Sequence, residues 1–427
     1  MTPFRRLAVL SALIFFAVMG FAVDHGRKQG SPLPIIQPIA FHNPPILLTS
    51  QLSPDASLWT VITQGFSLNH ETQNPRVQNF IRYDIAHKNL TLDVLNNSRP
   101  ILYTIVQAIQ TRNLPMELAL LPAVESGYRL GVQSGPGAMG PWQLLPQTAQ
   151  EYGVTVDSYW YDGRQDMQVS TFAALSFLSD LYNSQNHNWL LAIAAYNSGG
   201  TTVKNAIAVN QKNHLPTDYF NLKLPDQTQD YVPKLLALCE IIAHPDHYGF
   251  TLPDIPNKPT VTQVFMTRQI NLATASAFAG VNLDTLNNLN SAFLYGILPN
   301  QGPSYLYIPA TNTQRFEFEA KHHSYDQYWR LYEVEPGEFL TTIAKNHQTN
   351  ISTLAKINNL SSLMLQPHQT LITPASTGRI RKTDLVKPHE TLASFAARNN
   401  TNISSLALIN GLDPLQPIRP EMRLIIN

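Results

Sequence analysis

The stretch "LLPAVESGY" (residues 120–128) places one carboxylate, Glu125, in a segment that is otherwise largely apolar. Glu125 follows Leu118 by seven residues and Leu121 by four, which is the spacing of a single helix face. The spacing predicts a helix that carries Glu125 on its buried side. Gly127 predicts the end of that helix, because glycine readily adopts the conformation that ends helices. The sequence thus indicates a buried glutamate at a helix end.

The surroundings of Glu125 have helical periodicity from residue 62 to residue 244. In "RPILYTIVQAIQTRNL" (99–114) and "STFAALSFLSDLYN" (170–183), apolar residues return every three or four positions. Alternating patterns typical of strands are nearly missing from this region. We therefore expect a mainly α fold for residues 62–244.

Composition excludes several classes of protein. A chain of 427 residues is too long for one compact core, so several domains are expected. The 29 basic and 29 acidic residues balance, which argues against a nucleic-acid partner. The 13 histidines show no metal-ligand spacing, and we expect neither a metal nor a cofactor. The single cysteine, Cys239, lies in an apolar helical run and is expected to be a buried thiol.

The first 23 residues indicate export. Arg5 and Arg6 precede Leu7–Val23, a run that is uncharged and nearly all apolar. Such a segment is either a signal peptide, which we favour, or an N-terminal membrane anchor. Both readings predict a periplasmic or cell-envelope protein, and the lack of a nearby cysteine argues against a lipoprotein. Residues 24–61 are rich in proline and predict an extended arm.

The C-terminal part of the chain contains repeats. "HQTNISTLAKINNL" (347–360) returns as "NNTNISSLALINGL" (399–412), a shift of 52 residues. Strand-like runs flank each copy, which predicts small β-α-α-β units. Units of this size are usually binding modules, with plain spacers as the alternative. We divide this part into a Pro-rich linker (245–260), a degenerate copy (261–330), a first module (331–374), a second linker (375–383) and a partly degenerate second module (384–427).

A glycine-rich stretch, "SGPGAMGPWQLLPQTA" (134–149), follows Glu125. Its three glycines permit tight turns and a close approach of backbone to a ligand. The lysine and the preceding strand of a phosphate-binding loop are absent from it. An extended ligand with hydroxyl and acetamido groups, such as a sugar polymer, fits this stretch better.

Four motifs in this order resemble the family 1 lytic transglycosylases: "ALLPAVESGY" (119–128), the glycine-rich stretch, "AAYNSG" (194–199) and "QTQDYVPKLLAL" (227–238). The resemblance implies a lysozyme-like helical fold and cleavage of peptidoglycan glycan strands. The repeats resemble LysM modules, which implies binding of glycans that contain N-acetylglucosamine.

The resemblance makes Glu125 the sole catalytic acid and base. It would protonate the leaving oxygen between N-acetylmuramic acid and N-acetylglucosamine, and then deprotonate the C6 hydroxyl that closes a 1,6-anhydro ring. The substrate's acetamido group would replace the second carboxylate of ordinary glycosidases. Independently of any family, burial and the negative end of a helix both disfavour a carboxylate, so Glu125 should stay protonated near neutral pH.

The resemblance also implies residues that contact the substrate, with the Tyr196 hydroxyl near the acid. They are Ser134, Gln143, Tyr196, Asn197 and Tyr231. In the first module it implies a glycan-binding turn at Gly337, Glu338 and Phe339. We expect the acidic residues Asp157, Asp162 and Asp166 to be structural.

Departures from the family pattern affect the last motif and the repeats. Gln227 and Gln229 stand where the family usually has a glutamate and a basic residue, which removes an ion pair from the cleft. His389 stands where the first module has Gly337, so we expect weaker binding by the second module. A muramidase of the same fold and a non-catalytic wall-binding scaffold remain as alternatives, and the intact motifs around Glu125 argue against the scaffold.

Overall fold

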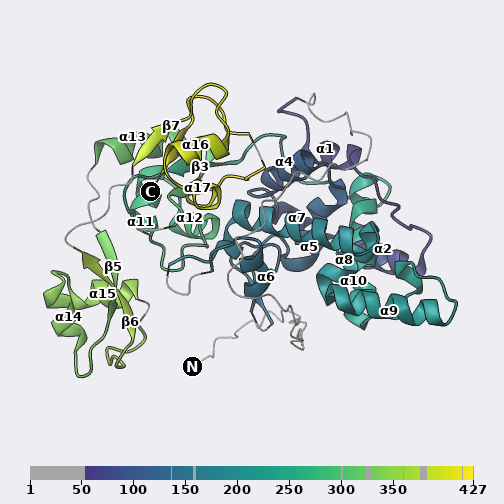
Figure 1. The fold of residues 1–427 in the computed structure, drawn as a ribbon, viewed down its shortest axis with the longest axis horizontal. Helices are drawn as coiled ribbons and strands as arrows, with labels where there is room; N and C mark the ends of the chain where they lie inside the picture. The colour runs from purple at the N-terminus through teal and green to yellow at the C-terminus, as the bar shows by residue number, and fades with distance from the viewer. Residues whose placement is uncertain are drawn as a thin grey trace, which may run out of the picture.

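The computed structural model describes residues 53–426 apart from 136, 157–159, 300–301, 324–327, 359, 376–381 and 416. A helical body carries three small β-α-α-β units, and the first module forms a lobe of its own (Figure 1). The mainly α prediction is confirmed. The export segment and most of the proline-rich arm lie outside the described residues. Within the described ranges, every helix is too short or too polar to cross a lipid bilayer.

Within its described residues, the helical body has ten α-helices, three 3₁₀ turns and one short hairpin. They are α1 Leu58–Gln64, α2 Pro75–Ala86, α3 Lys88–Asn97, α4 Leu102–Arg112, η1 Met116–Leu120, α5 Leu121–Ser126, β1 Gln133–Ser134, β2 Ala138–Met139, α6 Pro146–Glu151, η2 Gly163–Gln165, α7 Met167–Ser184, α8 Trp189–Ser198, α9 Gly200–Lys212, η3 Tyr219–Asn221 and α10 Asp226–Ala243. In α8, Ala192, Ile193 and Ala194 are consecutive and all buried, so this helix lies inside the body.

The helical body extends beyond the expected limits at both ends. Helix α1 begins at Leu58, within the segment expected to be an extended arm, and this residue is fully buried. The proline-rich stretch 245–260 is packed on the body, because Phe250 and Ile255 are buried in the same core. The Leu58 N–H donates to the Ile255 carbonyl over 2.7 Å, which joins the two ends. This stretch is therefore not a free linker.

Each of the three repeats is a two-stranded antiparallel sheet with two helices between its strands. The degenerate copy has β3 Val261–Phe265, α11 Leu272–Ala279, α12 Leu283–Leu289, β4 Tyr305–Pro309 and an added helix, α13 Thr313–His322. The first module has β5 Tyr328–Glu333, α14 Leu340–Asn346, α15 Ile351–Ile357 and β6 Thr370–Ala375. The second has β7 Thr383–Leu385, α16 Leu392–Arg398, α17 Ile403–Asn410 and β8 Arg423–Ile425.

One asparagine holds each repeat together. Asn290, Asn358 and Asn410 occupy the same place, at the end of the second helix. Each side-chain amide donates to a helix carbonyl four residues back and to a carbonyl of the last strand, and its oxygen accepts an N–H from that strand, over 2.6–3.0 Å. The shared pattern shows that the degenerate copy keeps the fold of the two modules.

A buried carboxylate joins the degenerate copy to the helical body. Asp166 accepts the backbone N–H groups of Gln168 and Val169 and so caps helix α7. It also accepts hydroxyl hydrogen bonds from Tyr305 and Tyr307 of β4, over 2.8 and 2.9 Å. Burial raises the pKa of Asp166. The two units therefore share one polar contact inside their common core.

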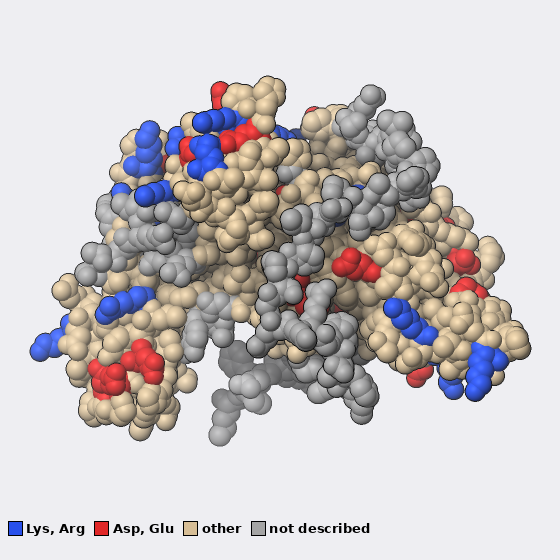
Figure 2. Space-filling model, in the orientation of Figure 1, with Lys and Arg blue, Asp and Glu red and all other residues tan. Residues whose placement is uncertain are grey.

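Asp162 has a structural contact too. It caps η2 through the Arg164 N–H and forms a buried ion pair with the Arg164 guanidinium over 2.6 Å. Asp157 lies outside the described residues. On the face shown in Figure 2, basic and acidic side chains are scattered over a mostly uncharged surface, in keeping with the zero net charge.

Replacing Asp166 with alanine should destabilise the protein. The change removes a helix cap, which contributes ~0.5–2 kcal/mol, and leaves two buried hydroxyls without an acceptor at ~1–3 kcal/mol each. These terms add to about 2.5–8 kcal/mol, and we expect a loss in the lower half of this range in urea denaturation followed by circular dichroism, because the change also removes a buried carboxylate. Asp166→Asn keeps an acceptor without a buried charge and should lose much less. Equal urea midpoints for Asp166→Ala and the wild type would contradict the role of this residue.

Candidate active site

Glu125 lies at the end of a helix that is shorter than the sequence predicts. The expected continuous helix is divided into the 3₁₀ turn η1 and the six-residue helix α5. Gly127 ends α5 with a left-handed φ of 62°, as predicted. A 3₁₀ turn has about three residues per turn instead of 3.6, so the apolar stripe does not continue in register into α5. Leu118 and Leu121 are fully buried, whereas Glu125 is partly exposed. Glu125 is therefore on the packed side of α5, as expected, with part of its surface open to solvent.

Helix α10 supplies the hydrogen-bond partner of the acid. The Tyr231 hydroxyl donates to Glu125 Oε1 over 2.5 Å, and the Tyr231 side chain is buried. Burial raises the pKa of Glu125 to about 7, and the hydrogen bond from Tyr231 acts in the opposite direction. A carboxyl group with this pKa exchanges a proton readily near neutral pH. The arrangement suits a general acid that later serves as a general base.

The glycine-rich stretch forms the β1–β2 hairpin. Gly137 and Gly140 have φ angles of 112° and 80°, which side chains rarely adopt. A Cβ atom on Gly140 would lie 1.8 Å from the Arg164 carbonyl oxygen. The close approach that requires Gly140 is therefore to the protein's own backbone, and not to a ligand as the sequence suggested.

Ser134 and Gln143 hold this hairpin closed. The Ser134 hydroxyl donates to the Gln143 side-chain oxygen. The Gln143 amide donates to the Gly140 carbonyl over 2.7 Å and to the Val132 carbonyl over 3.2 Å. Both side chains are partly exposed. Their described contacts fix the loop, and their exposed parts remain available to a substrate.

Tyr196 and Asn197 lie on α8, and their contacts differ from those of Tyr231. The Tyr196 hydroxyl donates to the Trp142 carbonyl over 2.8 Å. Burial, and to a lesser degree the Glu125 charge, raise the pKa of Tyr196, so the acid is near this tyrosine. The Asn197 side-chain oxygen accepts from the Thr228 hydroxyl of α10 over 2.8 Å. Among the residues predicted to contact the substrate, Tyr231 donates a hydrogen bond to Glu125, whereas the Tyr196 hydroxyl donates to a backbone carbonyl.

Sequence reasoning missed a second glutamate close to the acid in the chain. Glu117 on η1 is fully buried and accepts the N–H groups of Ser67 and Leu68 over 2.7 Å each. The His70 ring lies 3.5 Å from Glu117 and 3.6 Å from Glu240 of α10. The signal available in the sequence was a charged residue within the apolar run "PMELALL" (115–121).

The predicted glycan-binding turn of the first module is largely open. Gly337 has a φ of 85° with free space around it, and Phe339 is 71% exposed. Glu338 accepts from the Tyr332 hydroxyl and from the Glu335 N–H, so it shapes the turn. An aromatic side chain left in solvent on a fixed turn is suited to stacking on a sugar ring.

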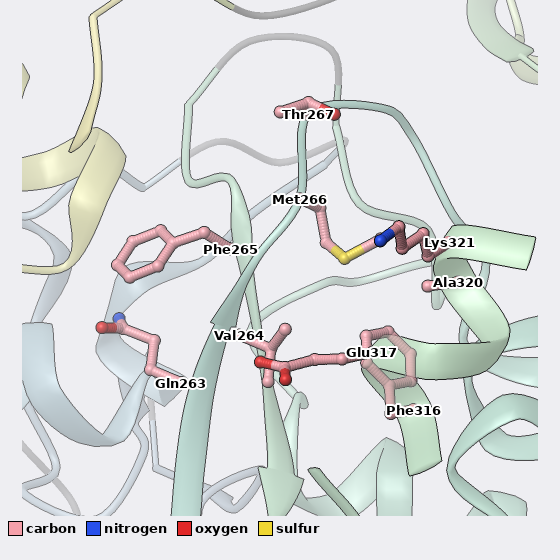
Figure 3. A pocket seen from close by; sticks show the side chains of 9 residues that line it. All are labelled: Gln263, Val264, Phe265, Met266, Thr267, Phe316, Glu317, Ala320 and Lys321. Carbon is pink, nitrogen blue, oxygen red and sulfur yellow. The ribbon is translucent and has the colours of Figure 1, made fainter. Parts of the chain in front are cut away.

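A separate cavity of about 340 Å³ lies between β3 and α13 of the degenerate copy. Figure 3 shows Met266 and Lys321 beside each other at this cavity, with Glu317 nearby. None of the predicted site residues lines it. Within the described ranges, no group of three or more histidine, cysteine or acidic side chains is placed to hold a metal ion.

Comparison with known proteins matches the helical body and the repeats to separate family models. The family model "Transglycosylase SLT domain" matches residues 103–217, and the model "Lytic transglycosylase MltD, LysM-like domain" matches residues 260–324. The LysM domain model matches residues 332–374 and 385–427. The degenerate copy thus corresponds to a recognised LysM-like domain.

Two relatives are similar over most of their length. The membrane-bound lytic murein transglycosylase D of Escherichia coli strain K12 is 30% identical over 376 residues, which are 84% of this chain and 83% of the relative. Its counterpart in E. coli O6:H1 strain CFT073 gives the same values. An endolysin of Bacillus phage PZA is 38% identical over 81 residues, 18% of this chain and 30% of the endolysin.

Removing the Tyr231 hydroxyl should shift the pH dependence of glycan cleavage. A general acid must be protonated to act, so in that role Glu125 would make kcat/KM fall as the pH rises through its pKa of about 7. The hydrogen bond favours the carboxylate, so Tyr231→Phe should raise the Glu125 pKa and move this limb to higher pH by about one unit. Tyr196→Phe is the matched control and should leave the limb in place. A limb that stays or moves to lower pH in Tyr231→Phe would refute the assignment.

Proposed function

The chain belongs to the family of membrane-bound lytic murein transglycosylase D, and on this basis we propose how its residues cleave and hold peptidoglycan. It is a lytic transglycosylase that acts on peptidoglycan, with LysM modules that bind the glycan. We assign residues 62–244 to catalysis, and the family-model match at 103–217 supports this assignment.

Glu125 begins the reaction as a general acid. It transfers its proton to the oxygen that joins C1 of N-acetylmuramic acid to C4 of N-acetylglucosamine, and the bond from C1 to this oxygen breaks. The observation that carries this assignment is the Glu125 carboxyl group itself: partly exposed, hydrogen-bonded to Tyr231, and with a pKa raised to about 7. A carboxyl group with an ordinary pKa would hold almost no proton at neutral pH.

The same carboxyl group completes the reaction as a general base. As carboxylate, Glu125 takes the proton of the C6 hydroxyl while that oxygen bonds to C1, which gives a 1,6-anhydro sugar and restores the protonated acid. The acetamido oxygen of the substrate assists at C1 between the two steps, so a second protein carboxylate is not required. Water takes no part in the balanced reaction.

The remaining cleft residues position the glycan. Ser134 and Gln143 fix the glycine hairpin and are partly exposed, which supports a role for this hairpin as a wall that hydrogen-bonds the sugar. Tyr196 and Asn197 present a second wall from α8. In the first module, the open turn with Phe339 supports binding to N-acetylglucosamine.

The similarity to a membrane-bound relative supports a location in the cell envelope. We propose that residues 1–23 direct export to the periplasm and are then removed, with retention as an anchor as the other outcome. N-terminal sequencing of the mature protein distinguishes the two.

Glu125→Gln should abolish cleavage while the fold is kept, because the amide cannot donate a proton to the leaving oxygen. The loss of a general acid costs ~10²–10⁴-fold, and here one group acts twice. Release of soluble fragments from purified sacculi measures the rate, and circular dichroism controls for folding. Retention of more than about a tenth of the wild-type rate would exclude Glu125 as the acid.

The products should separate a transglycosylase from a muramidase of the same fold. Closure of the anhydro ring gives muropeptides that are lighter by one water than hydrolysed ones. We expect mass spectrometry of digested sacculi to find the lighter species as the main new ends. A majority of reducing ends would instead identify a hydrolase.

A further inference from the structure

The two modules have the same fold and different surroundings. In Figure 1 the second module, with α16 and α17, lies over the degenerate copy, while the first module, with α14 and α15, is a separate lobe. The first module contacts the degenerate copy through a small apolar cluster of Trp329, Ile297 and Ile372, and through a 2.7 Å hydrogen bond from the Trp329 N–H to the Gln269 side chain. The second module makes polar contacts with both the degenerate copy and the helical body.

A buried ion pair links the second module to the helical body. Arg112, the last residue of α4, donates to Asp413 in the loop after α17 through two nitrogens, over 2.5 and 3.0 Å. The two side chains are 7% and 0% exposed. The Arg112 guanidinium also lies over the Phe172 ring of α7, 5.3 Å from its centre. This bidentate, desolvated geometry characterises the stronger class of ion pair.

The first module has no such charge at the matching position. The shift of 52 residues aligns Asp413 with Ser361, which is exposed to solvent. The residues that follow, Leu363 and Met364, are 60% and 81% exposed. Leu415, which aligns with Leu363, is also exposed, so the two loops differ at the position of Asp413, which is open in the first module and held against α4 in the second.

The second module is also attached to the degenerate copy. The Ile409 carbonyl accepts the Ser304 N–H over 3.1 Å. A Cβ atom on Gly411 would lie 2.2 Å from the Gln263 side chain and 2.7 Å from the Tyr305 ring, so the loop is in close contact with both. Tyr305 in turn donates to Asp166 of the helical body.

The turn expected to bind glycan has also changed in the second module. Thr391 takes the place of Phe339, so the exposed aromatic ring is lost. Glu390, which aligns with Glu338, is paired with Arg398 through two hydrogen bonds of 2.7 and 3.0 Å.

We propose that the second module is a docked structural part of the catalytic unit, held by Arg112 and Asp413, and that the first module alone tethers the enzyme to glycan. The tethering half of this proposal rests on the proposed function.

The docking half is tested by thermal unfolding of the full chain. Asp413→Asn leaves the Arg112 guanidinium buried without its anion, and we expect the melting temperature to fall by roughly 5–10 °C. Ser361→Ala is the matched control and should leave it unchanged. Arg112→Met combined with Asp413→Asn should recover part of the loss, because no buried charge remains. An unchanged melting temperature in Asp413→Asn would overturn the docking.

The tethering half is tested by co-sedimentation of full-chain variants with purified sacculi. Phe339→Ala should reduce the bound fraction several-fold, whereas Thr391→Ala at the matching position should bind like the wild type. Equal losses in both variants would overturn the division of roles. A wild-type chain that does not sediment would refute glycan binding by the repeats, and with it the tethering half, while the unfolding result would still decide the docking half.

Discussion

The hydrogen bond between Tyr231 and Glu125 joins a helix that is too short to be stable alone to one that is firmly packed. Helix α5 has six residues, and isolated helices of that length do not form in water. Helix α10 has 18 residues and packs against α1, α2, α5 and α8. The position of the acid therefore depends on α10. The same contact also moderates the effect of burial on Glu125, so that its pKa is raised to about 7 and not further.

The sequence predicts the identity of the acid and the end of its helix, because both depend on local pattern. A charged residue at the end of an apolar run and a glycine two residues after it are visible without a structure. The 3₁₀ turn before α5 cannot be recognised in the sequence, because the residues of η1 and α5 together have the apolar pattern of one continuous helix. The choice between Tyr196 and Tyr231 as the partner of Glu125 is hidden for a similar reason. Both tyrosines lie on buried helices, and the packing of α8 and α10 decides which hydroxyl reaches the acid.

The repeats show the same limit at a larger scale. The shift of 52 residues predicts both modules, and their asparagines fulfil the same role in each. Where each module lies could not be predicted, because Arg112 and Asp413 are 301 residues apart. Likewise Asp166 was expected to be structural, but its tyrosine partners on β4 are more than 130 residues away. Tertiary packing determines contacts of this kind. The sequence shows each residue of such a pair, but it does not show that the two residues meet.

Glu117 and Glu125 show how the surroundings give two like residues different roles. They lie eight positions apart on one segment that ends against α10. Glu117 is fully buried and accepts two backbone N–H groups, so its carboxylate is committed to holding the chain after α1. Glu125 has one recorded hydroxyl donor and an open side, so it can meet a substrate. This segment also packs directly against α10, and the His70 ring lies between Glu117 and Glu240, which is on the far side of Pro233. Because a proline within a helix removes a backbone hydrogen bond, an anchor on each side of it keeps α10 in register. Glu117 thereby lies on the segment that packs against α10, the helix that carries Tyr231, the hydrogen-bond partner of Glu125.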